Sequence, residues 1–445
     1  MNDLDTFINL ARERDFFSPS APIVISRAPG RLDVMGGIAD YSGSLVLQRP
    51  IAETTFAAFQ PATDNRIQVL SFPGREYSVD MAALAPNGNP VSYQTSHSWF
   101  SDRPGDQWAA YAIGVLQVLM TEHAVAFHGG ARILISSTIP EGKGVASSAA
   151  FEAAVLQAAV AASGLSLEPQ HIAVMCQKAE NLVAGAPCGL MDQMTCVMGK
   201  SGSLLSLLCQ PADLQPFVTI PADLEFWGLD SGVKHSVGGS DYRSVRTGAF
   251  MAQRIMAAAG SGPAFYLANV SPATFERDFA PILPEEMSGV EFIKRYTSTI
   301  DPVTAIEPNR VYKIRQPAAH PIYEHDRVQM FRQLLQAPPN EKQRMQLGEL
   351  MYASHRSYTA CGLGSSGTDR LVDLVQSTGP AHGLYGARIS GGGSGGTVVI
   401  LGRRDAAPAI EQIAGAYEKA TGYRPYIFSG SAAGSAEFGT RTIHF

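Results

Sequence analysis

A glycine-containing segment followed by two serines, IPEGKGVASSAA at 139–150, is the first part of this sequence that could bind a ligand. Gly142 and Gly144 allow backbone amides to approach a ligand closely, and the helix predicted from Ser147 presents its N-terminus at the same point. This arrangement favours a phosphate, and the hydroxyls of Ser147 and Ser148 suit phosphate and Mg²⁺. The lysine is followed by glycine, so the segment is not a Walker loop. A capped turn without a ligand is the alternative interpretation.

A second glycine-rich segment, ISGGGSGGTVV at 389–399, has five glycines in six positions. Such a density predicts that the backbone lies close to another group. Residues 392–396 match the G-x-S-x-G pattern of hydrolases, but a strand is predicted to follow, and His444 is the only downstream histidine. We therefore reject a hydrolase, and a flexible hairpin loop remains the alternative.

Three charged residues lie beside glycines and could act on a ligand. Asp192 follows the turn GAPCG at 185–189 and is a candidate base or metal ligand. Arg31 and Asp40 lie in the stretch RAPGRLDVMGGIADYSG at 27–43, where a cation and an acceptor could converge on a polar ligand. A helix-capping aspartate and a surface ion pair are the alternatives. The ten histidines show no metal-ligand spacing, so we predict no zinc site.

The composition indicates a folded protein with a small-molecule partner. The chain has 445 residues, enough for two or three domains, and 45% are hydrophobic while 17% are charged. Because Lys and Arg number 34 against 40 Asp and Glu, the net charge is −6. This charge argues against nucleic acid and against an anionic membrane as partners.

Cysteine usage and the hydrophobic pattern suggest a cytoplasmic location. The five cysteines are an odd number and form no C-x-x-C pair, which fits a reducing compartment. The first residues lack the pattern of a signal peptide. The apolar stretch at 145–167 is rich in alanine and predicts a buried helix rather than a membrane span.

Hydrophobic periodicity predicts mixed α and β structure in two domains, 1–205 and 206–445. The first glycine-containing stretch is predicted as a loop between two strands, and the proline-rich part at 263–321 as a surface excursion. The predicted strands are 23–26, 44–47, 131–138, 203–208, 225–229 and 397–401. The predicted helices are 108–120, 147–163, 169–183, 241–259, 325–335, 369–376 and 407–420.

Three blocks in this order, RAPGRLDVMGG-x-x-DYSG, PEGKGVASSA and ISGGGSGG, resemble the signatures of the galactokinase, homoserine kinase, mevalonate kinase and phosphomevalonate kinase (GHMP kinase) superfamily. The segments at 176–194 and 233–246 look like galactokinase segments, and DVMGGIADYSGSLVLQ is similar to the kinase domain of plant L-arabinokinases. The resemblance implies an α+β fold with two lobes. The N-terminal lobe would resemble domain 2 of ribosomal protein S5, the C-terminal lobe would be ferredoxin-like, and the site would lie between them.

The resemblance also implies roles for individual residues in binding ATP, Mg²⁺ and a sugar. Asp192 would be the acid beside the anomeric hydroxyl, and Arg31 the cation that supports it. Ser148 and Glu180 would hold Mg²⁺, while amides from Gly142 to Ser147 would bind the triphosphate. Trp108 and Tyr111 would form a pocket for adenine. Asp40, Gly189 and Tyr242 would contact the sugar. Residues 391–396 would close the site.

Two departures from the galactokinase pattern bear on the substrate. Galactokinases have Glu-His where this chain has Gly37 and Ile38, which leaves a smaller and apolar wall. L-Arabinopyranose is galactopyranose without the hydroxymethyl group, so this wall predicts L-arabinose as substrate and β-L-arabinose 1-phosphate as product. The second departure is Asp33 in place of asparagine, which could reposition Arg31. A galactokinase or another sugar kinase is the main alternative, and an inactive sensor of sugar and ATP is a further one. The oligomeric state is not indicated.

Overall fold

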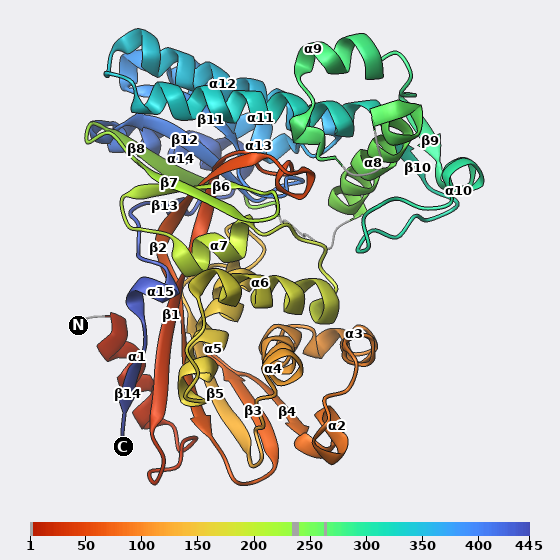
Figure 1. Cartoon of the computed structure of the whole chain (residues 1–445). Helices are drawn as coiled ribbons and strands as arrows, with labels where there is room; N and C mark the ends of the chain where they lie inside the picture. The colour runs from red at the N-terminus through yellow and green to blue at the C-terminus, as the bar shows by residue number, and fades with distance from the viewer. Residues whose placement is uncertain (1–2, 234–239, 262–264) are drawn as a thin grey trace.

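The computed structural model describes residues 3–233, 240–261 and 265–445, which form two halves around two sheets (Figure 1). The larger sheet has eight strands, in the order β14-β1-β2-β5-β3-β4, with β6 paired to β2 and β7 paired to β6. All of these pairs are antiparallel except β3 with β5. The strands of this sheet are β1 (Ile23–Met35), β2 (Leu45–Pro61), β3 (Arg66–Ser71), β4 (Arg75–Asp80), β5 (Gly130–Ser137), β6 (Ser203–Leu208), β7 (Asp213–Thr219) and β14 (Arg441–Ile443).

The first glycine-containing stretch is mostly strand, so the predicted loop between residues 26 and 44 was too long. β1 continues to Met35, and Arg31 therefore lies on a strand. Its pairing with β2 is interrupted between Pro29 and Arg31 and again between Asp33 and Met35. The first irregularity accommodates Pro29 and Gly30 within the strand, as bulges commonly do. Only the segment between β1 and β2 forms the connection.

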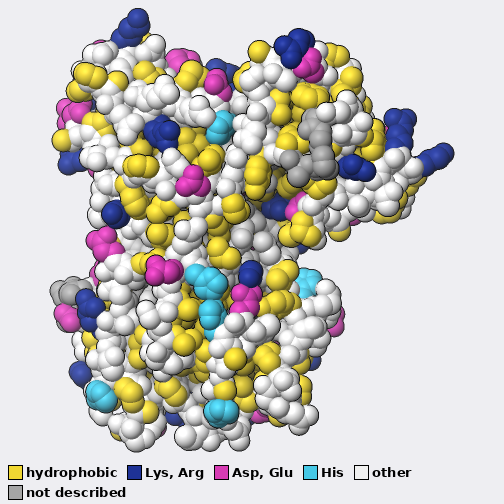
Figure 2. All heavy atoms as spheres, in the orientation of Figure 1, with side chains coloured by type: hydrophobic (Ala, Val, Ile, Leu, Met, Phe, Trp, Pro, Cys, Tyr) yellow, Lys and Arg dark blue, Asp and Glu magenta, His cyan; other side chains and the backbone are white. Residues whose placement is uncertain are grey.

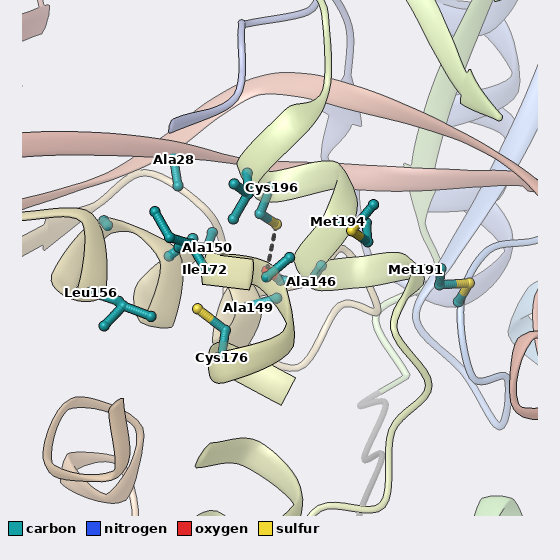
Figure 3. Packing of buried hydrophobic residues seen from close by; sticks show 14 of the residues in the cluster. Ala28, Ala146, Ala149, Ala150, Leu156, Ile172, Cys176, Met191, Met194 and Cys196 are labelled. Carbon is teal, nitrogen blue, oxygen red and sulfur yellow. Dashed lines mark hydrogen bonds between the residues drawn. The ribbon is translucent and has the colours of Figure 1, made fainter. Parts of the chain in front are cut away.

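Alanine-rich helices cover one face of the larger sheet. Helix α5 packs against β1 and β2, and its buried alanines allow close approach. Figure 3 shows Cys196 of α7 pointing toward Ala146 at the start of α5, with its sulfur 4.0 Å from the Ala146 carbonyl oxygen. This contact ties α7 to the segment before α5. The helices of this half are α1 (Asp3–Glu13), α2 (Met81–Leu84), α3 (Tyr93–Ser101), α4 (Ala109–His123), α5 (Ser147–Ala162), α6 (Pro169–Ala179) and α7 (Met191–Met198).

The C-terminal half is built on an antiparallel sheet of four strands, in the order β11-β12-β8-β13. In chain order these are the second, third, first and fourth strands, the arrangement of a ferredoxin-like fold. Its strands are β8 (Leu224–Asp230), β11 (Leu384–Ile389), β12 (Thr397–Arg403) and β13 (Ile427–Phe428). Its helices include α11 (Arg315–Gln336), α12 (Glu341–Cys361), α13 (Ser366–Thr378) and α14 (Ala407–Thr421). The short α15 (Ser435–Phe438) instead packs against β1, α5 and α7 of the other half.

From residue 265 on, the proline-rich part of the chain packs around a core of its own, so the prediction of a surface excursion was wrong for these residues. Its apolar side chains pack with those of α8 (Ser240–Met256), and Phe275, Phe292 and Tyr312 are almost completely buried. The elements of this part are α9 (Pro272–Thr274), β9 (Glu286–Ser288), α10 (Gly289–Tyr296) and β10 (Val311–Lys313). Pro272 begins α9, a position that proline favours.

Figure 2 shows the molecule hollowed on one side, between the part that carries α8 to α10 and helices α3 and α6. A cavity of about 490 Å³ is lined from both sides, for example by His97 of α3 and Arg243 of α8. Within the described part of the chain, no helix combines the length and apolarity needed to cross a membrane.

The boundary between the two halves follows the sheets. The predicted boundary near residue 205 falls inside β6, and both β6 and β7 pair within the larger sheet. We therefore propose a boundary between Thr219 and Leu224. The chain also returns to the larger sheet at its end, where β14 pairs with β1.

Candidate active site

An ion pair between β1 and α7 lies at the centre of the candidate site. Arg31 donates from Nε to Oδ1 of Asp192 at 2.9 Å and from Nη2 to Oδ2 at 2.8 Å. The Arg31 side chain is 3% exposed and that of Asp192 is 18% exposed. Burial alone would lower the pKa of Arg31, but the carboxylates of Asp192 and Asp33 raise it above its usual value. The guanidinium is thus charged, and it fixes the orientation of the Asp192 carboxylate.

The segment before α5 is held against Arg31. The Arg31 amide donates to the Val145 carbonyl at 3.0 Å, and Nη1 donates to the Gly144 carbonyl at 2.6 Å. Gly142 and Gly144 have φ values of 71° and 70°, a region in which glycine is favoured. Ser147 then begins α5. The predicted phosphate loop therefore lies directly beside the ion pair.

Ser148 and Glu180, the two residues expected to bind Mg²⁺, are in contact. Ser148 Oγ donates to Glu180 Oε1 at 2.8 Å, and Gln193 Nε2 donates to Glu180 Oε2 at 2.6 Å. Glu180 begins a π-helical turn, a feature frequent at functional sites. Burial raises the pKa of Glu180 to about 7.

The Ser148 hydroxyl and the Glu180 carboxylate fit a magnesium ion whose remaining ligands are other oxygens. Across residues 3–233, 240–261 and 265–445, no group of three or more His, Cys, Asp and Glu side chains could hold a metal by itself. Mg²⁺ commonly uses one or two protein oxygens together with water and substrate phosphates. Ser148 and Glu180 line the same cavity as the predicted phosphate loop, where such phosphates would lie.

A cavity of about 860 Å³ extends from the ion pair past the phosphate loop. Trp108 and Tyr111 line it together with Ser147 and Ser148, so the structure brings the predicted nucleotide residues together. Burial raises the pKa of Tyr111 well above its usual value, so the phenol is neutral. The volume is in the range of pockets that bind small organic ligands.

A second, small cavity adjoins the ion pair on its other side and shares Arg31 and Asp192 with the first. Its volume of about 20 Å³ holds about one water molecule, so a sugar enters only if the walls shift. The lining residues are Arg31, Ile38, Asp40, Cys188, Gly189, Met191, Asp192, Tyr242, Gly391 and Gly392. Most of the predicted sugar-binding residues thus surround one cavity.

Asp40 is the buried acid of this small cavity. Burial and the nearby charge of Asp192 raise the pKa of Asp40 to about 7. A Cβ atom on Gly189 would lie 1.7 Å from Asp40 Oδ2, so the close approach requires glycine at this position. One oxygen of Asp40, Oδ1, is buried and has no hydrogen-bond partner among the described residues. It is therefore available to a ligand hydroxyl.

Gly37 lies behind the wall of this cavity and does not line it. Its carbonyl oxygen lies 3.2 Å from Nε2 of His320. Ile38 forms the wall, with φ of 50°, which is unusual for a β-branched residue and is sustained by its burial. Of the galactokinase-like segment at 233–246, residues 234–239 lie outside the described residues.

The sequence suggested that Asp33 could reposition Arg31. In the structure the Asp33 carboxylate makes its contacts with other residues and not with Arg31. Asp33 Oδ2 accepts from Nη1 of Arg388 at 2.9 Å, and both side chains are completely buried. Gln48 Nε2 donates to Asp33 Oδ1 at 2.7 Å. The second departure from the galactokinase pattern is therefore part of a buried ion pair between the two halves.

Sequence comparisons agree with this arrangement. The GHMP kinases N terminal domain matches residues 110–200, the GHMP kinases C terminal domain matches 331–419, and the galactokinase galactose-binding signature matches 13–61. A galactokinase from Chloroflexus aggregans is 30% identical over 404 residues, which cover 90% of this chain and 88% of that protein. The chain belongs to the GHMP kinase family.

One further sequence relative and two similar structures complete the comparison of this GHMP kinase with known proteins. An L-arabinokinase from Arabidopsis thaliana is 43% identical over 490 residues, which cover 95% of this chain and 47% of that protein. The chain thus spans about half the length of this relative. The Lactococcus lactis galactokinase complexed with galactose has a TM-score of 0.73 at 19% identity, covering 99% of this chain and 100% of that one. A mevalonate kinase has a TM-score of 0.56 at 15% identity, covering 92% and 99%. These structures confirm the predicted fold.

Several site residues of this GHMP kinase were not predicted from sequence. Phe72, Arg75 and Phe151 line the large cavity, and the Arg75 guanidinium lies 5.1 Å from the centre of the Trp108 ring. Phe151 follows Ser147 by one helical turn, which could have indicated that both face the same side. Phe72 and Arg75 flank the turn between β3 and β4, and no local pattern connects this turn with the phosphate loop.

Proposed function

We propose that this GHMP kinase transfers the γ-phosphoryl group of ATP to the anomeric hydroxyl of L-arabinose. The observation that carries the proposal is the position of Arg31 and Asp192, which line both the large cavity and the small one. A phosphoryl group bound in the large cavity and a hydroxyl bound in the small one would meet at this pair. Such positioning is the main requirement of phosphoryl transfer.

Asp192 would act as the base. Its two oxygens accept hydrogen bonds from Arg31, and each carboxylate oxygen keeps a further lone pair for the sugar hydroxyl. As the anomeric oxygen bonds to the γ-phosphorus, its proton passes to Asp192, and the bond from that phosphorus to the bridging oxygen of ADP breaks. Arg31 would stabilise the negative charge of the transferring group.

Nucleotide and metal would be held by the first half of the chain. The backbone from Gly142 to Ser147 and the N-terminus of α5 would bind the phosphates of ATP. The aromatic wall with Trp108 would bind its adenine ring. Ser148 and Glu180 would hold Mg²⁺, which when bound neutralises charge on the phosphate oxygens.

The substrate L-arabinose is supported by sequence similarity and by the wall of the small cavity. The relative that shares 43% identity with this chain is an L-arabinokinase. Ile38 lines this cavity, and its apolar side chain offers no hydrogen bond to the hydroxymethyl group that distinguishes galactose from L-arabinose. Asp40 and Tyr242 supply polar groups for the ring hydroxyls.

Galactose is the second candidate substrate. The galactokinase galactose-binding signature matches residues 13–61, and the chain covers most of a galactokinase that is 30% identical. An inactive sensor of sugar and ATP is disfavoured, because Ser148, Glu180 and Asp192 are all present and converge.

We also propose a cytoplasmic location. The five cysteines are buried free thiols, which fits a reducing compartment.

Sugar-dependent release of ADP tests the proposal. Mg-ATP is supplied with L-arabinose, D-galactose, D-glucuronate or no sugar, and kcat/KM is measured for each. We expect the highest kcat/KM with L-arabinose, and a sugar-dependent release that is slower by roughly 10²-fold or more in the Asp192→Asn variant. Preference for galactose would support the sugar-kinase activity but refute the argument that the Ile38 wall favours L-arabinose. No turnover with any of the three sugars would refute the proposed substrate.

A further inference from the structure

Asp33 and Arg388 form the most deeply buried ion pair among the described residues, since both side chains are 0% exposed. Asp33 comes from β1 in the N-terminal half and Arg388 from β11 in the C-terminal half. Arg388 Nη1 bonds both the carboxylate and the carbonyl oxygen of Asp33, each at 2.9 Å. Arg388 Nε bonds Ser354 Oγ of α12 at 3.0 Å. One pair thus connects three elements of the two halves.

The same carboxylate holds the start of the second glycine-rich segment. The Gly391 amide donates to Asp33 Oδ2 at 3.3 Å, and the Asp33 amide donates to Ser390 Oγ at 2.8 Å. Tyr358, whose ring centre lies 5.0 Å from the Arg388 guanidinium, donates its hydroxyl to the Gly391 carbonyl at 2.9 Å.

Gly391 is held where the two cavities meet. A Cβ atom there would lie 2.9 Å from the Gly144 carbonyl and 3.2 Å from Arg31 Nη2. Gly391 and Gly392 line the small cavity and are not among the lining residues of the large one. A shift of this segment would therefore change the sugar side of the site first.

The pair also excludes a side chain from residue 37. A Cβ atom on Gly37 would lie 2.0 Å from Asp33 Oδ2 and 2.2 Å from the Tyr358 hydroxyl. An acidic side chain there would add a second negative charge beside Asp33. Arg388 Nη2 is buried and has no partner in the described part of the chain, so it could donate a hydrogen bond to a second carboxylate if Asp33 lost its charge.

We propose that Asp33 and Arg388 are positioning residues that hold the glycine segment 391–396 against Arg31 and, by occupying the space beside Gly37, set which sugar the small cavity accepts. The part about sugar choice rests on the proposed function. The part about positioning does not, because it follows from the contacts of Gly391 alone. The two sequence departures, at residues 33 and 37, are then one coupled feature.

The first test compares Asp33→Asn with Glu225→Gln. Asparagine keeps the size of the side chain but removes its charge. Glu225 pairs with the buried Arg49 across the two halves and lines neither cavity, so its variant controls for the loss of a buried pair. For Asp33→Asn we expect kcat/KM for the best sugar of the wild type to fall at least tenfold, with the KM of Mg-ATP within twofold. Unchanged sugar kinetics in Asp33→Asn, or an equal loss in Glu225→Gln, would overturn the proposal.

Hydrogen exchange tests positioning without reference to any sugar. In Asp33→Asn we expect amides in 391–396 to exchange at least tenfold faster than in the wild type and in Glu225→Gln. Unchanged exchange would overturn the positioning role, even if the wild type turned out to prefer galactose or to use none of the tested sugars.

A double-mutant cycle tests the coupling of residues 33 and 37. Gly37→Glu alone should lower kcat/KM at least 100-fold, because its side chain meets the Asp33 carboxylate. In the Asp33→Asn background the same change should cost less than tenfold, because its carboxylate can pair with Arg388. Additive losses would overturn the coupling. If the wild type uses none of the sugars, the same cycle is measured by hydrogen exchange of the amides in 391–396. An equal increase of the exchange rate by Gly37→Glu in both backgrounds would likewise overturn the coupling.

Discussion

Arg31 and Asp192 face each other through two parallel hydrogen bonds of 2.9 and 2.8 Å, although 161 residues separate them in the chain. This geometry fixes the plane of the carboxylate at the junction of the two cavities. If Asp192 is the base, as proposed, its carboxylate is already oriented before a substrate hydroxyl binds.

Replacing Asp192 by asparagine should therefore stop chemistry while leaving nucleotide binding intact. The amide cannot take the proton, so we expect kcat to fall by roughly 10²–10⁴. The KM of Mg-ATP should stay within twofold, as measured by steady-state ADP release. Asp405→Asn is the matched control, because Asp405 is exposed and lines neither cavity. Turnover like that of the wild type in Asp192→Asn would contradict the assignment of the base.

Ser148→Ala should raise the Mg²⁺ requirement. The variant loses a candidate ligand and the hydrogen bond to Glu180, so we expect the Mg²⁺ concentration for half-maximal rate to rise about tenfold. The folded state should lose about 1 kcal/mol. Ser163→Ala removes a hydroxyl just after the opposite end of α5 and should leave the Mg²⁺ titration unchanged. An unaltered titration in Ser148→Ala would exclude this residue as a ligand.

Asp40 should make the stability of the ligand-free protein depend on pH. Its pKa is about 7 in the folded protein, above its usual 3.8, so the folded state binds its proton more tightly than the unfolded state. The stability that this proton provides is complete below pH 4 and is lost as pH rises through 7. The total corresponds to about 4 kcal/mol.

The measurement compares the melting temperatures of wild type and Asp40→Asn between pH 5 and pH 8. Asparagine carries no charge to bury, so the variant should gain stability relative to the wild type as pH rises, with a plateau above pH 7. A difference that does not change across this range would show that Asp40 does not titrate there.

Trp108→Ala should weaken nucleotide binding and leave sugar binding unchanged. Trp108 lines only the larger of the two cavities, and Arg75 lies over its ring. Loss of this aromatic surface should raise the KM of Mg-ATP about tenfold, which corresponds to about 1.4 kcal/mol. Trp108→Phe keeps an aromatic ring and should recover most of the affinity. An equal rise in both the nucleotide KM and the sugar KM would argue for a general structural role.

Local features of this chain were predictable because their causes lie within a few residues. The helical periodicity after Ser147, and the two glycines before it, place the start of α5 as observed. The motif resemblance also placed Ser148 and Glu180 at one site, although their separation in the chain gives no physical indication of contact.

Other elements were missed because distant partners decide them. β1 extends to Met35 because β2 pairs along most of its length, although its sequence contains proline and glycine. Helix α12 was not predicted, since its buried residues are interspersed with polar ones such as Gln343, His355 and Ser354 that find partners or burial in the fold.

The sequence by itself determined the two-lobed α+β architecture, the glycine-containing segment at the start of α5 and the family to which the chain belongs. Only the tertiary structure decided that Asp33 pairs with Arg388, 355 residues away, and that Gly37 faces this pair and not the small cavity. The physical reason is that a buried charge must be compensated, and its partner can come from any element that the fold brings within hydrogen-bond distance. No local pattern carries that information.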